Sequence, residues 1–218
     1  MKAKITLMKT FFRVGIIFSL LLLAGCNGYR SKSDSAMESA NDSLSATEKK
    51  QDNDSLQTPT LSQISEYDDL IRAEAAKIGW DWRLIASLIY QESRFKPHLI
   101  NHKGAFGLMQ LMPTTMEKYH IDHNATVEQQ LEAGGKLLVH LNKKFSAVVT
   151  DSLERVNFVL ASYNTGFSRV MNYREQTLEN GGNPNVWFDN VECYSSKQTV
   201  AFVREITERY SYYKASIE

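Results

Sequence analysis

The sequence predicts an all-α domain in residues 61–218 on three grounds. Apolar side chains recur there every three or four residues, which is the spacing of one face of a helix. Residues that commonly cap helices stand before several of these apolar stripes. No run of alternating apolar and polar residues is long enough to predict a sizeable sheet, although a small hairpin around residues 104–107 is compatible with the pattern.

The first two helices are predicted on either side of Gly79. An apolar stripe runs through residues 62–78 and stops before Gly79, and glycine is common immediately after a helix. Asp81 can cap a second helix that runs to about Ser93, because its carboxylate can accept hydrogen bonds from the amides of the first turn.

Two further helices are predicted to begin at patterns that resemble capping boxes. These patterns are Thr126-x-x-Gln129 and Asp151-x-x-Glu154. The face of the first helix that should be buried comprises Leu131, Gly134, Leu138 and Leu141. The Gly134-Gly135 pair predicts close packing, because a residue without a side chain lets a neighbour approach the backbone.

The end of the chain is predicted to form a terminal helix, preceded by a long loop. The stripe of that helix comprises Val200, Val203, Ile206 and Tyr210. Residues 171–196 contain the run Gly181-Gly182-Asn183-Pro184, and we predict that this whole region is loop-like.

The first 60 residues have a different composition. Residues 1–25 are a basic segment and an apolar run shorter than the ~20 residues that span a membrane, which predicts a signal peptide. Leu23-Ala24-Gly25-Cys26 resembles the lipobox of bacterial lipoproteins, which implies a lipid on Cys26; the alternative is an ordinary signal peptide with a chance cysteine. Residues 26–60 are rich in small polar and charged side chains and predict a disordered tether. Asn27 is not typical of an inner-membrane signal, so the expected location is lipid-anchored at the outer membrane, facing the periplasm.

The charge and cysteine counts argue against several classes of function. The 218 residues include 25 basic and 25 acidic side chains, whereas nucleic-acid-binding proteins usually have a basic surplus. Two cysteines are too few for a disulfide framework, and no C-x-x-C pair indicates structural zinc. Cys193 is expected to be buried, with no assigned chemistry. The five histidines show no metal-ligand spacing and are expected to be exposed or capping residues.

One carboxylate lies on an apolar helix face. Glu92 follows Ile85 by seven residues and Leu88 by four, so on a helix it shares their stripe. Burial raises the pKa of a carboxyl group and keeps it protonated near neutral pH. A protonated carboxylic acid is what general-acid cleavage of a glycosidic bond requires. The alternative is a structural salt bridge with Arg94, Lys96 or a distant arginine.

Three sequence blocks around this residue form a pattern. They are Tyr90-Gln91-Glu92-Ser93-Arg94-Phe95, the segment from Gly104-Ala105-Phe106-Gly107 to Leu108-Met109-Gln110-Leu111-Met112-Pro113, and Ala161-Ser162-Tyr163-Asn164-Thr165-Gly166. In this order they resemble the catalytic domain of the soluble-type lytic transglycosylases, which cleave bacterial murein. The resemblance covers about residues 64–213 and implies a helical fold like that of goose-type lysozyme.

The resemblance implies a role for each matching residue. Glu92 matches the sole catalytic acid and base. Gln110 and Met112 match positions that line the cleft and hold the sugar, whereas Met109 is expected in the core. Tyr163 matches a tyrosine whose hydroxyl orients the acid. Asn164 could bind ligand or cap backbone.

Two positions depart from the family pattern. Asn101 stands where the family often has serine, and its amide could still bind a carboxyl group or a sugar. Near the C-terminus, where the family often has a glutamate and a tyrosine, Gln198 lacks the charge and Phe202 lacks the hydroxyl, while the helix itself is still expected.

The implied reaction cleaves the bond between N-acetylmuramic acid and N-acetylglucosamine without water and forms a 1,6-anhydro ring. The expected partners are peptidoglycan glycan strands, and the membrane through the lipid on Cys26; no nucleic acid, metal or organic cofactor is implied. One alternative is a lysozyme-type hydrolase whose second carboxylate would be Asp122. Others are a non-catalytic murein-binding lipoprotein and a structural tether between the membrane and the wall.

Overall fold

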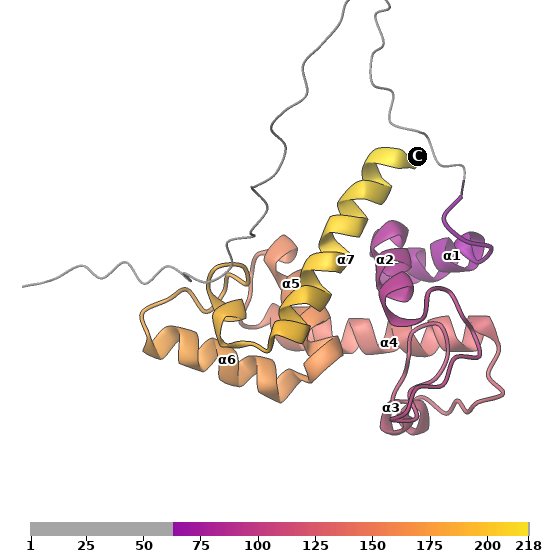
Figure 1. Ribbon diagram of the computed structural model, residues 1–218, viewed down its shortest axis with the longest axis horizontal. Coiled ribbons are helices and arrows are strands. Elements are labelled where there is room, and N and C mark those ends of the chain that lie inside the picture. The colour runs from indigo at the N-terminus through magenta and orange to yellow at the C-terminus, as the bar shows by residue number, and fades with distance from the viewer. Residues whose placement is uncertain (1–62, 218) are drawn as a thin grey trace, which may run out of the picture. The chain divides into compact units, whose positions relative to one another are not determined.

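The computed structural model describes residues 63–217, and the predicted signal peptide, Cys26 and the tether lie outside these residues. Its elements are α1 (Asp68–Ile78), α2 (Trp82–Ser93), α3 (Pro113–Lys118), α4 (Val127–Ser146), α5 (Ser152–Thr165), α6 (Phe167–Glu179), the 3-10 helix η1 (Val191–Tyr194) and α7 (Lys197–Ser216) (Figure 1). No strand forms within residues 63–217, so the all-α prediction is confirmed there. In the same residues, no helix is long and apolar enough to cross a membrane.

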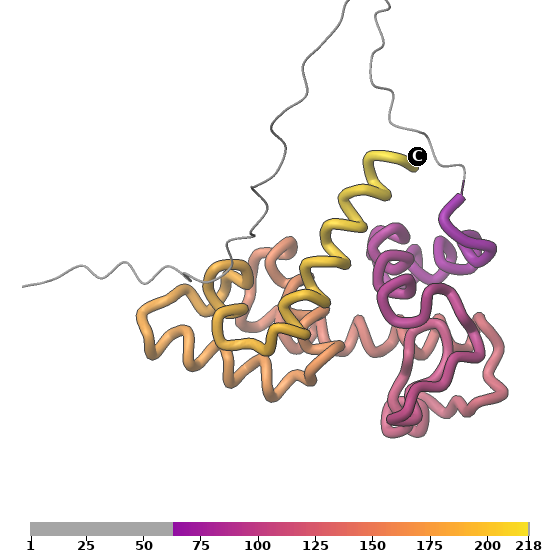
Figure 2. The backbone as a smooth tube through the Cα atoms, in the orientation of Figure 1, coloured from indigo at the N-terminus to yellow at the C-terminus, as the bar shows by residue number. Residues whose placement is uncertain are grey.

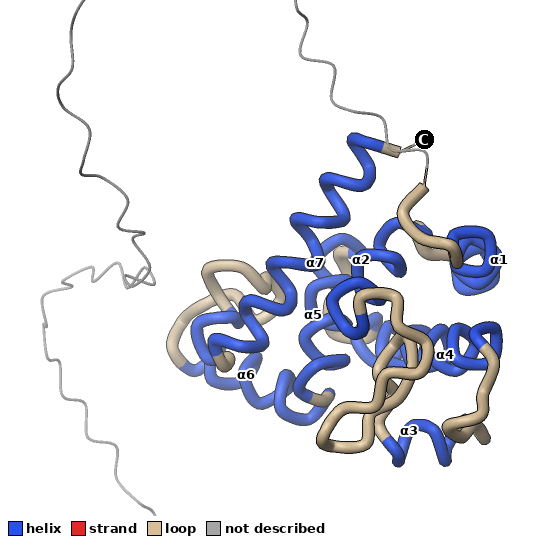
Figure 3. The backbone as a smooth tube through the Cα atoms, turned by 45° about the vertical axis from the view of Figure 1, so that its right-hand side comes forward, coloured by secondary structure: helices blue, strands red, loops and turns tan. Residues whose placement is uncertain are grey.

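The helices pack in a connected series around one core. Helix α2 packs against α1 and α7, α4 packs against α1 and α5, and α5 also packs against α6 and α7. The predicted faces are buried, including Ile85, Leu88 and Ile89 of α2 and Leu131 and Leu138 of α4. Figure 2 shows the path of the backbone, and Figure 3 shows irregular backbone concentrated between α2 and α4 and between α6 and α7.

Side chains close the helix ends as their sequences predict. Asp81 accepts a hydrogen bond from the backbone N–H of Arg83 at 2.9 Å, and Gly79 ends α1 with φ = 72°. Thr126 and Gln129 form a reciprocal capping box at the start of α4. These local signals therefore place the end of α1 and the starts of α2 and α4, whereas α1 begins at Asp68 and not at residue 62.

Asp151 caps helix α5 as predicted, but Glu154, the second residue of the predicted capping box, bonds to another segment. Asp151 accepts hydrogen bonds from the backbone N–H groups of Leu153 and Glu154, at 2.7 and 3.1 Å. The Glu154 carboxylate accepts a hydrogen bond from the backbone N–H of Trp187 at 3.0 Å. It therefore fastens the segment before η1 to α5.

The loop predicted for residues 171–196 is correct only after residue 179, because α6 continues through Glu179. This helix has no side-chain cap and a largely polar sequence, and Phe167, Val170 and Met171 mark its apolar face only in the first two turns. Tertiary contacts hold it instead: the buried Arg174 donates hydrogen bonds to Pro184 O at 2.9 Å and to Asn185 Oδ1 at 2.6 Å.

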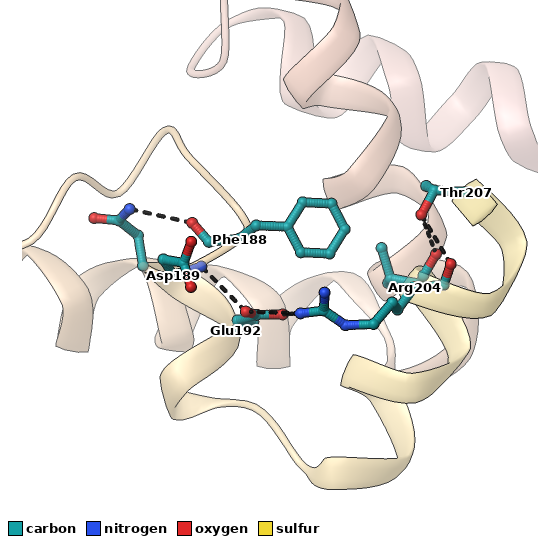
Figure 4. Close-up of polar contacts among 7 residues, drawn as sticks. Phe188, Asp189, Glu192, Arg204 and Thr207 are labelled. Atoms are coloured by element: carbon teal, nitrogen blue, oxygen red, sulfur yellow. Dashed lines mark hydrogen bonds and ion pairs between the residues drawn. The ribbon is translucent and has the colours of Figure 1, made fainter. Parts of the chain in front are cut away.

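The segment between α6 and α7 is fixed to α7 by an ion pair (Figure 4). Glu192 lies 3.2 Å from Arg204 Nη2 and accepts a hydrogen bond from the backbone N–H of Asp189 at 3.1 Å. The Arg204 guanidinium also lies over the ring of Phe188, 5.0 Å from its centroid. The expectation of a buried Cys193 is wrong, because Val191 takes the inward position of η1 and Cys193 is exposed.

Close packing by the glycine pair of α4 is confirmed. A Cβ atom on Gly134 would lie 2.1 Å from Met109 Sδ, and one on Gly135 would lie 2.3 Å from Glu74 Oε1. The backbone of α4 therefore seats Met109, which is 1% exposed and belongs to the core as expected. Gly134 fixes the position of the irregular segment that precedes α3.

Candidate active site

Glu92 lies in the last turn of α2, on the stripe that faces the core. Its side chain is half-buried, and the surrounding protein raises its pKa from 4.5 to about 8. The cause is desolvation, because removal of water disfavours the carboxylate more than the neutral acid. Glu92 therefore holds a proton at neutral pH and can donate it.

Helix α2 ends abruptly just after Glu92. Arg94 and Phe95 both have left-handed backbone conformations, with φ of 53° and 59°. Such conformations cost free energy in residues other than glycine and occur where surrounding structure enforces them. They end α2 one residue after Glu92 and start the loop that leads to residue 107.

Residues 107–110 form a tight turn. Phe106 and Leu111 close it with two backbone hydrogen bonds, Phe106 N to Leu111 O at 3.0 Å and Leu111 N to Phe106 O at 2.9 Å. Gly107 and Gln110 within the turn have φ of 79° and 47°. The predicted hairpin is thus reduced to isolated bridges among residues 100, 106 and 111.

Side chains from three helices hold this turn. Ser93 of α2 donates a hydrogen bond through Oγ to Leu108 O at 2.7 Å. Gln130 of α4 accepts one at Oε1 from Leu108 N at 2.9 Å. Tyr163 of α5 donates one from its hydroxyl to Met109 O at 2.7 Å. The turn is therefore fixed to the residue next to Glu92.

Tyr163 differs from its expected role. Its hydroxyl hydrogen is bonded to the Met109 carbonyl and not to Glu92. The pKa of the phenol is raised by burial and by the negative charge of Glu92. The charge of Glu92 therefore acts on Tyr163, while the hydrogen bond from Tyr163 to Met109 O orients the turn.

Gln110 and Met112 differ in how much of each side chain remains available to a ligand. The Gln110 amide is buried and donates to Leu99 O and to Gly107 O, both at 3.0 Å. Its Oε1 is left to accept hydrogen bonds, so in this conformation it can receive a donor but cannot supply one. Met112, at the start of α3, is 43% exposed and accessible to a ligand.

The two asparagines organise backbone around the site. Asn101 Oδ1 accepts hydrogen bonds from Lys103 N at 2.8 Å and Ala105 N at 3.1 Å. Asn164 Oδ1 accepts a hydrogen bond from Thr199 Oγ1 at 2.9 Å, which links the end of α5 to the start of α7. In both residues the amide NH₂ group is the part left for a ligand.

Ser93 and Gln130 were missed as site residues by the sequence reasoning. Both are buried polar residues on otherwise apolar helix faces: Ser93 follows Ile89 by four, and Gln130 precedes Gly134 by four. A polar residue at such a position needs a partner within the protein. That spacing was the available signal, although it does not identify the partner.

Asp122, the second carboxylate of the alternative hydrolase, and the five histidines are exposed residues. Asp122 is exposed in the segment before α4 and accepts a hydrogen bond from Asn124 N at 2.7 Å. All five histidines are exposed. Residues 63–217 contain no cluster of three or more His, Cys, Asp or Glu side chains that could hold a metal ion.

Fold and site together define a class of protein: an all-helical domain with one desolvated carboxylic acid beside a turn held from three helices. Residues 69–185 match the transglycosylase SLT domain family. The chain belongs to that family.

Curated relatives include longer proteins. A membrane-bound lytic murein transglycosylase F from Aeromonas hydrophila is 32% identical over 151 residues, which cover 69% of this chain and 29% of the relative. One from Desulfosudis oleivorans is 36% identical over 126 residues, which cover 58% of this chain and 28% of the relative. The chain thus spans less than a third of the length of these relatives.

Solved structures share the fold. An inactive mutant of the lytic transglycosylase Slt from Pseudomonas aeruginosa matches with a TM-score of 0.53 at 20% identity, covering 70% of this chain and 25% of that one. The 70 kDa soluble lytic transglycosylase from Escherichia coli matches with a TM-score of 0.54 at 21% identity, covering 68% and 24%. These likenesses support the expected lysozyme-like helical fold.

Proposed function

We propose that this domain is a murein-cleaving lytic transglycosylase in which Glu92 is the catalytic acid and base. The observation that supports it best is the desolvation of Glu92, which raises its pKa to about 8 and keeps the acid protonated at neutral pH. Membership of the SLT family supplies the substrate class, the glycan strands of peptidoglycan.

In the proposed reaction Glu92 first protonates the oxygen of the bond between N-acetylmuramic acid and N-acetylglucosamine. The bond to the sugar carbon C1 breaks, and the substrate's own N-acetyl group stabilises the positive charge that develops there. The Glu92 carboxylate then removes the proton of the muramyl C6 hydroxyl, whose oxygen bonds to C1. The products are a free N-acetylglucosamine hydroxyl and a 1,6-anhydro ring, and Glu92 regains its proton.

This cycle needs a single carboxyl group. Ordinary glycosidases use two, because one activates water or attacks the sugar. The second acid weighed for a lysozyme-type hydrolase, Asp122, is exposed and bound to the Asn124 amide, which favours the transglycosylase.

The remaining site residues have proposed contacts that follow from their free groups. Met112 supplies an exposed apolar wall for the sugar. Gln110 receives a sugar hydroxyl or amide hydrogen at Oε1. Asn101 and Asn164 offer their amide hydrogens to ligand oxygens.

A digest of purified sacculi tests the activity. We expect products ending in 1,6-anhydro-N-acetylmuramic acid, identified by mass spectrometry. Because Glu92 must be protonated to start the reaction, the rate should fall about tenfold per pH unit above its pKa of about 8. Hydrated ends would indicate a lysozyme-type hydrolase, and the absence of any product would indicate a binding protein.

The sequence further supports a lipoprotein anchored through Cys26, in the outer membrane and facing the periplasm. Residues 26–60 would then serve as a tether that lets the domain reach the wall. This proposal rests on the lipobox-like segment before Cys26.

Replacing Cys26 with serine should therefore remove the protein from the membrane fraction, or leave it with its signal peptide uncleaved. The reason is that the hydroxyl of serine cannot carry the thioether-linked lipid. Fractionation of cells followed by detection of the protein measures this, with Cys193→Ser as the matched control that should remain membrane-bound. A Cys26→Ser protein that is cleaved and still fractionates with membranes contradicts the anchor.

A further inference from the structure

The amide of Gln130 joins three separate segments. Its Oε1 accepts the hydrogen bond of Leu108 N at 2.9 Å. Its Nε2 donates to Pro97 O at 3.1 Å and to Ala125 O at 3.0 Å. The residue is 1% exposed, so all three bonds are shielded from water. A buried amide bonded at both ends fixes the relative positions of the chain segments that it connects.

The turn at residues 107–110 lies directly on this amide. A Cβ atom on Gly107 would be 2.2 Å from Gln130 Oε1, a separation that leaves no room for any side chain. One helical turn along α4, Gly134 seats Met109 in the same way. Gln130 and Gly134, four residues apart, thus form one face of α4 that shapes the turn.

The same turn is also hydrogen-bonded to α2, the helix that contains Glu92. Ser93, next to Glu92, bonds the carbonyl of Leu108, while Gln130 bonds its N–H. Tyr163, whose pKa is raised in part by the charge of Glu92, donates a hydrogen bond to the carbonyl of Met109. The peptide unit after Leu108 is therefore attached to α2, and the peptide unit before it is attached to α4.

We propose that Gln130 is a positioning residue, which fixes the turn at residues 107–110 beside Glu92 and thereby keeps water away from the acid. Gln130 acts through the turn, because its hydrogen bonds go to Leu108, Pro97 and Ala125 and not to Glu92. The consequence for catalysis rests on the proposed transglycosylase function, whereas the consequence for the hydration of Glu92 does not.

The charged side chains on α2 and α7 near this end of α2 interact with residues other than Glu92. On α7, which packs against α2, Glu205 accepts a hydrogen bond from Gln91 Nε2 and Arg209 donates one to Gln91 Oε1. On α2 itself, the Arg94 guanidinium lies over the ring of Tyr90. On α5, Tyr163 is neutral, with its pKa raised. Among residues 63–217 no ion pair involves Glu92, so its pKa reports its hydration.

The test is a titration of Glu92 by carboxyl ¹³C NMR in the full chain, comparing Gln130→Met with Gln129→Met. Methionine matches the length of glutamine and removes all three Gln130 hydrogen bonds. Gln129 is exposed and only completes the capping box of the same helix, so its variant controls for destabilisation of α4. We expect the Glu92 pKa to fall by about one pH unit or more in Gln130→Met, as water reaches the carboxylate, and to stay near 8 in the control.

In the murein assay the falling limb of the pH–rate profile should move to lower pH by the same amount, with kcat reduced more than KM is changed. A folded Gln130→Met protein whose Glu92 still titrates near 8 overturns the proposal, even if its melting temperature is lower. If Gln130→Met does not fold, Ser93→Ala removes the bond on the other side of Leu108 and must shift the titration in the same direction. A lowered Glu92 pKa in a chain without murein activity would retain the positioning role and reject the proposed function.

Discussion

Glu92→Gln should abolish murein cleavage while the domain stays folded. Glutamine has the size and polarity of the protonated acid, but it can neither give a proton to the leaving oxygen nor take one from the C6 hydroxyl. Both chemical steps are therefore lost together. Loss of general acid–base catalysis typically lowers the rate by at least ~10²–10⁴-fold, and here one residue serves both steps. The measurement is the release of soluble muropeptides from purified sacculi.

The same substitution should raise stability at neutral pH, which shows independently that the fold survives. The native state keeps Glu92 protonated up to about pH 8, while the unfolded chain releases that proton near 4.5. Native protein thus binds the extra proton between these values, and wild-type stability falls as the pH rises through this window. Glutamine does not titrate, so the variant should be more stable by roughly 3 kcal/mol at pH 7, with no advantage below pH 4.5.

The matched control is Glu117→Gln, which changes an exposed carboxylate on α3. It should leave cleavage and its pH dependence unchanged, because Glu117 is not part of the site. A purified Glu92→Gln protein that digests sacculi within roughly tenfold of wild type would falsify the assignment of the acid. Chemical denaturation at pH 4 and pH 7 supplies the stability comparison.

Local signals in the sequence were sufficient for most of the helical fold. The apolar stripe of α2 places Glu92 toward the core, and the Thr126 capping box opens α4 where predicted. The loop prediction missed the part of α6 after residue 170, where the buried Arg174 bonds to the carbonyls of Pro184 and Val148 in two other segments. A periodicity argument detects an apolar face, but it does not detect a buried cation held by backbone oxygens.

In the site as well, the sequence predicts which residues come together but not which hydrogen bonds they make. The raised pKa of Glu92 follows from its place on the stripe, and motif resemblance brings Gln110 and Tyr163 to the same region. Their hydrogen-bond partners do not follow, because an amide or hydroxyl takes whichever acceptor the folded chain places beside it. The structure directs Gln110 Nε2 and the Tyr163 hydroxyl to backbone carbonyls of the loop that contains the turn. Their first role is therefore to shape the turn.

Tyr163→Phe should lower murein cleavage roughly ten- to hundred-fold, which corresponds to losing about 1.5–3 kcal/mol at the site. The substitution removes the donor to Met109 O and leaves a buried carbonyl without that hydrogen bond. The turn at residues 107–110 then loses its attachment to α5, while the ring continues to fill its place. Stability should also fall, by about 1–3 kcal/mol, because an unsatisfied buried acceptor keeps its desolvation cost. Rates on sacculi and thermal unfolding measure the two effects.

The control is Tyr173→Phe on α6, whose hydroxyl has no hydrogen bond to another residue within 63–217, so neither quantity should change.

The pH–rate profile then distinguishes two roles for the Tyr163 hydroxyl. If it acts through the turn, its loss admits water to Glu92, the pKa of the acid falls from about 8, and the limb moves to lower pH. If the hydroxyl instead turns to donate to the Glu92 carboxylate during the reaction, its loss removes a stabilising partner of the charged form and the limb moves to higher pH. The product should remain 1,6-anhydro in either case, because ring closure uses the sugar's own C6 hydroxyl. Because the hydrogen bond to Met109 O is the one that the structure contains, we expect the shift to lower pH.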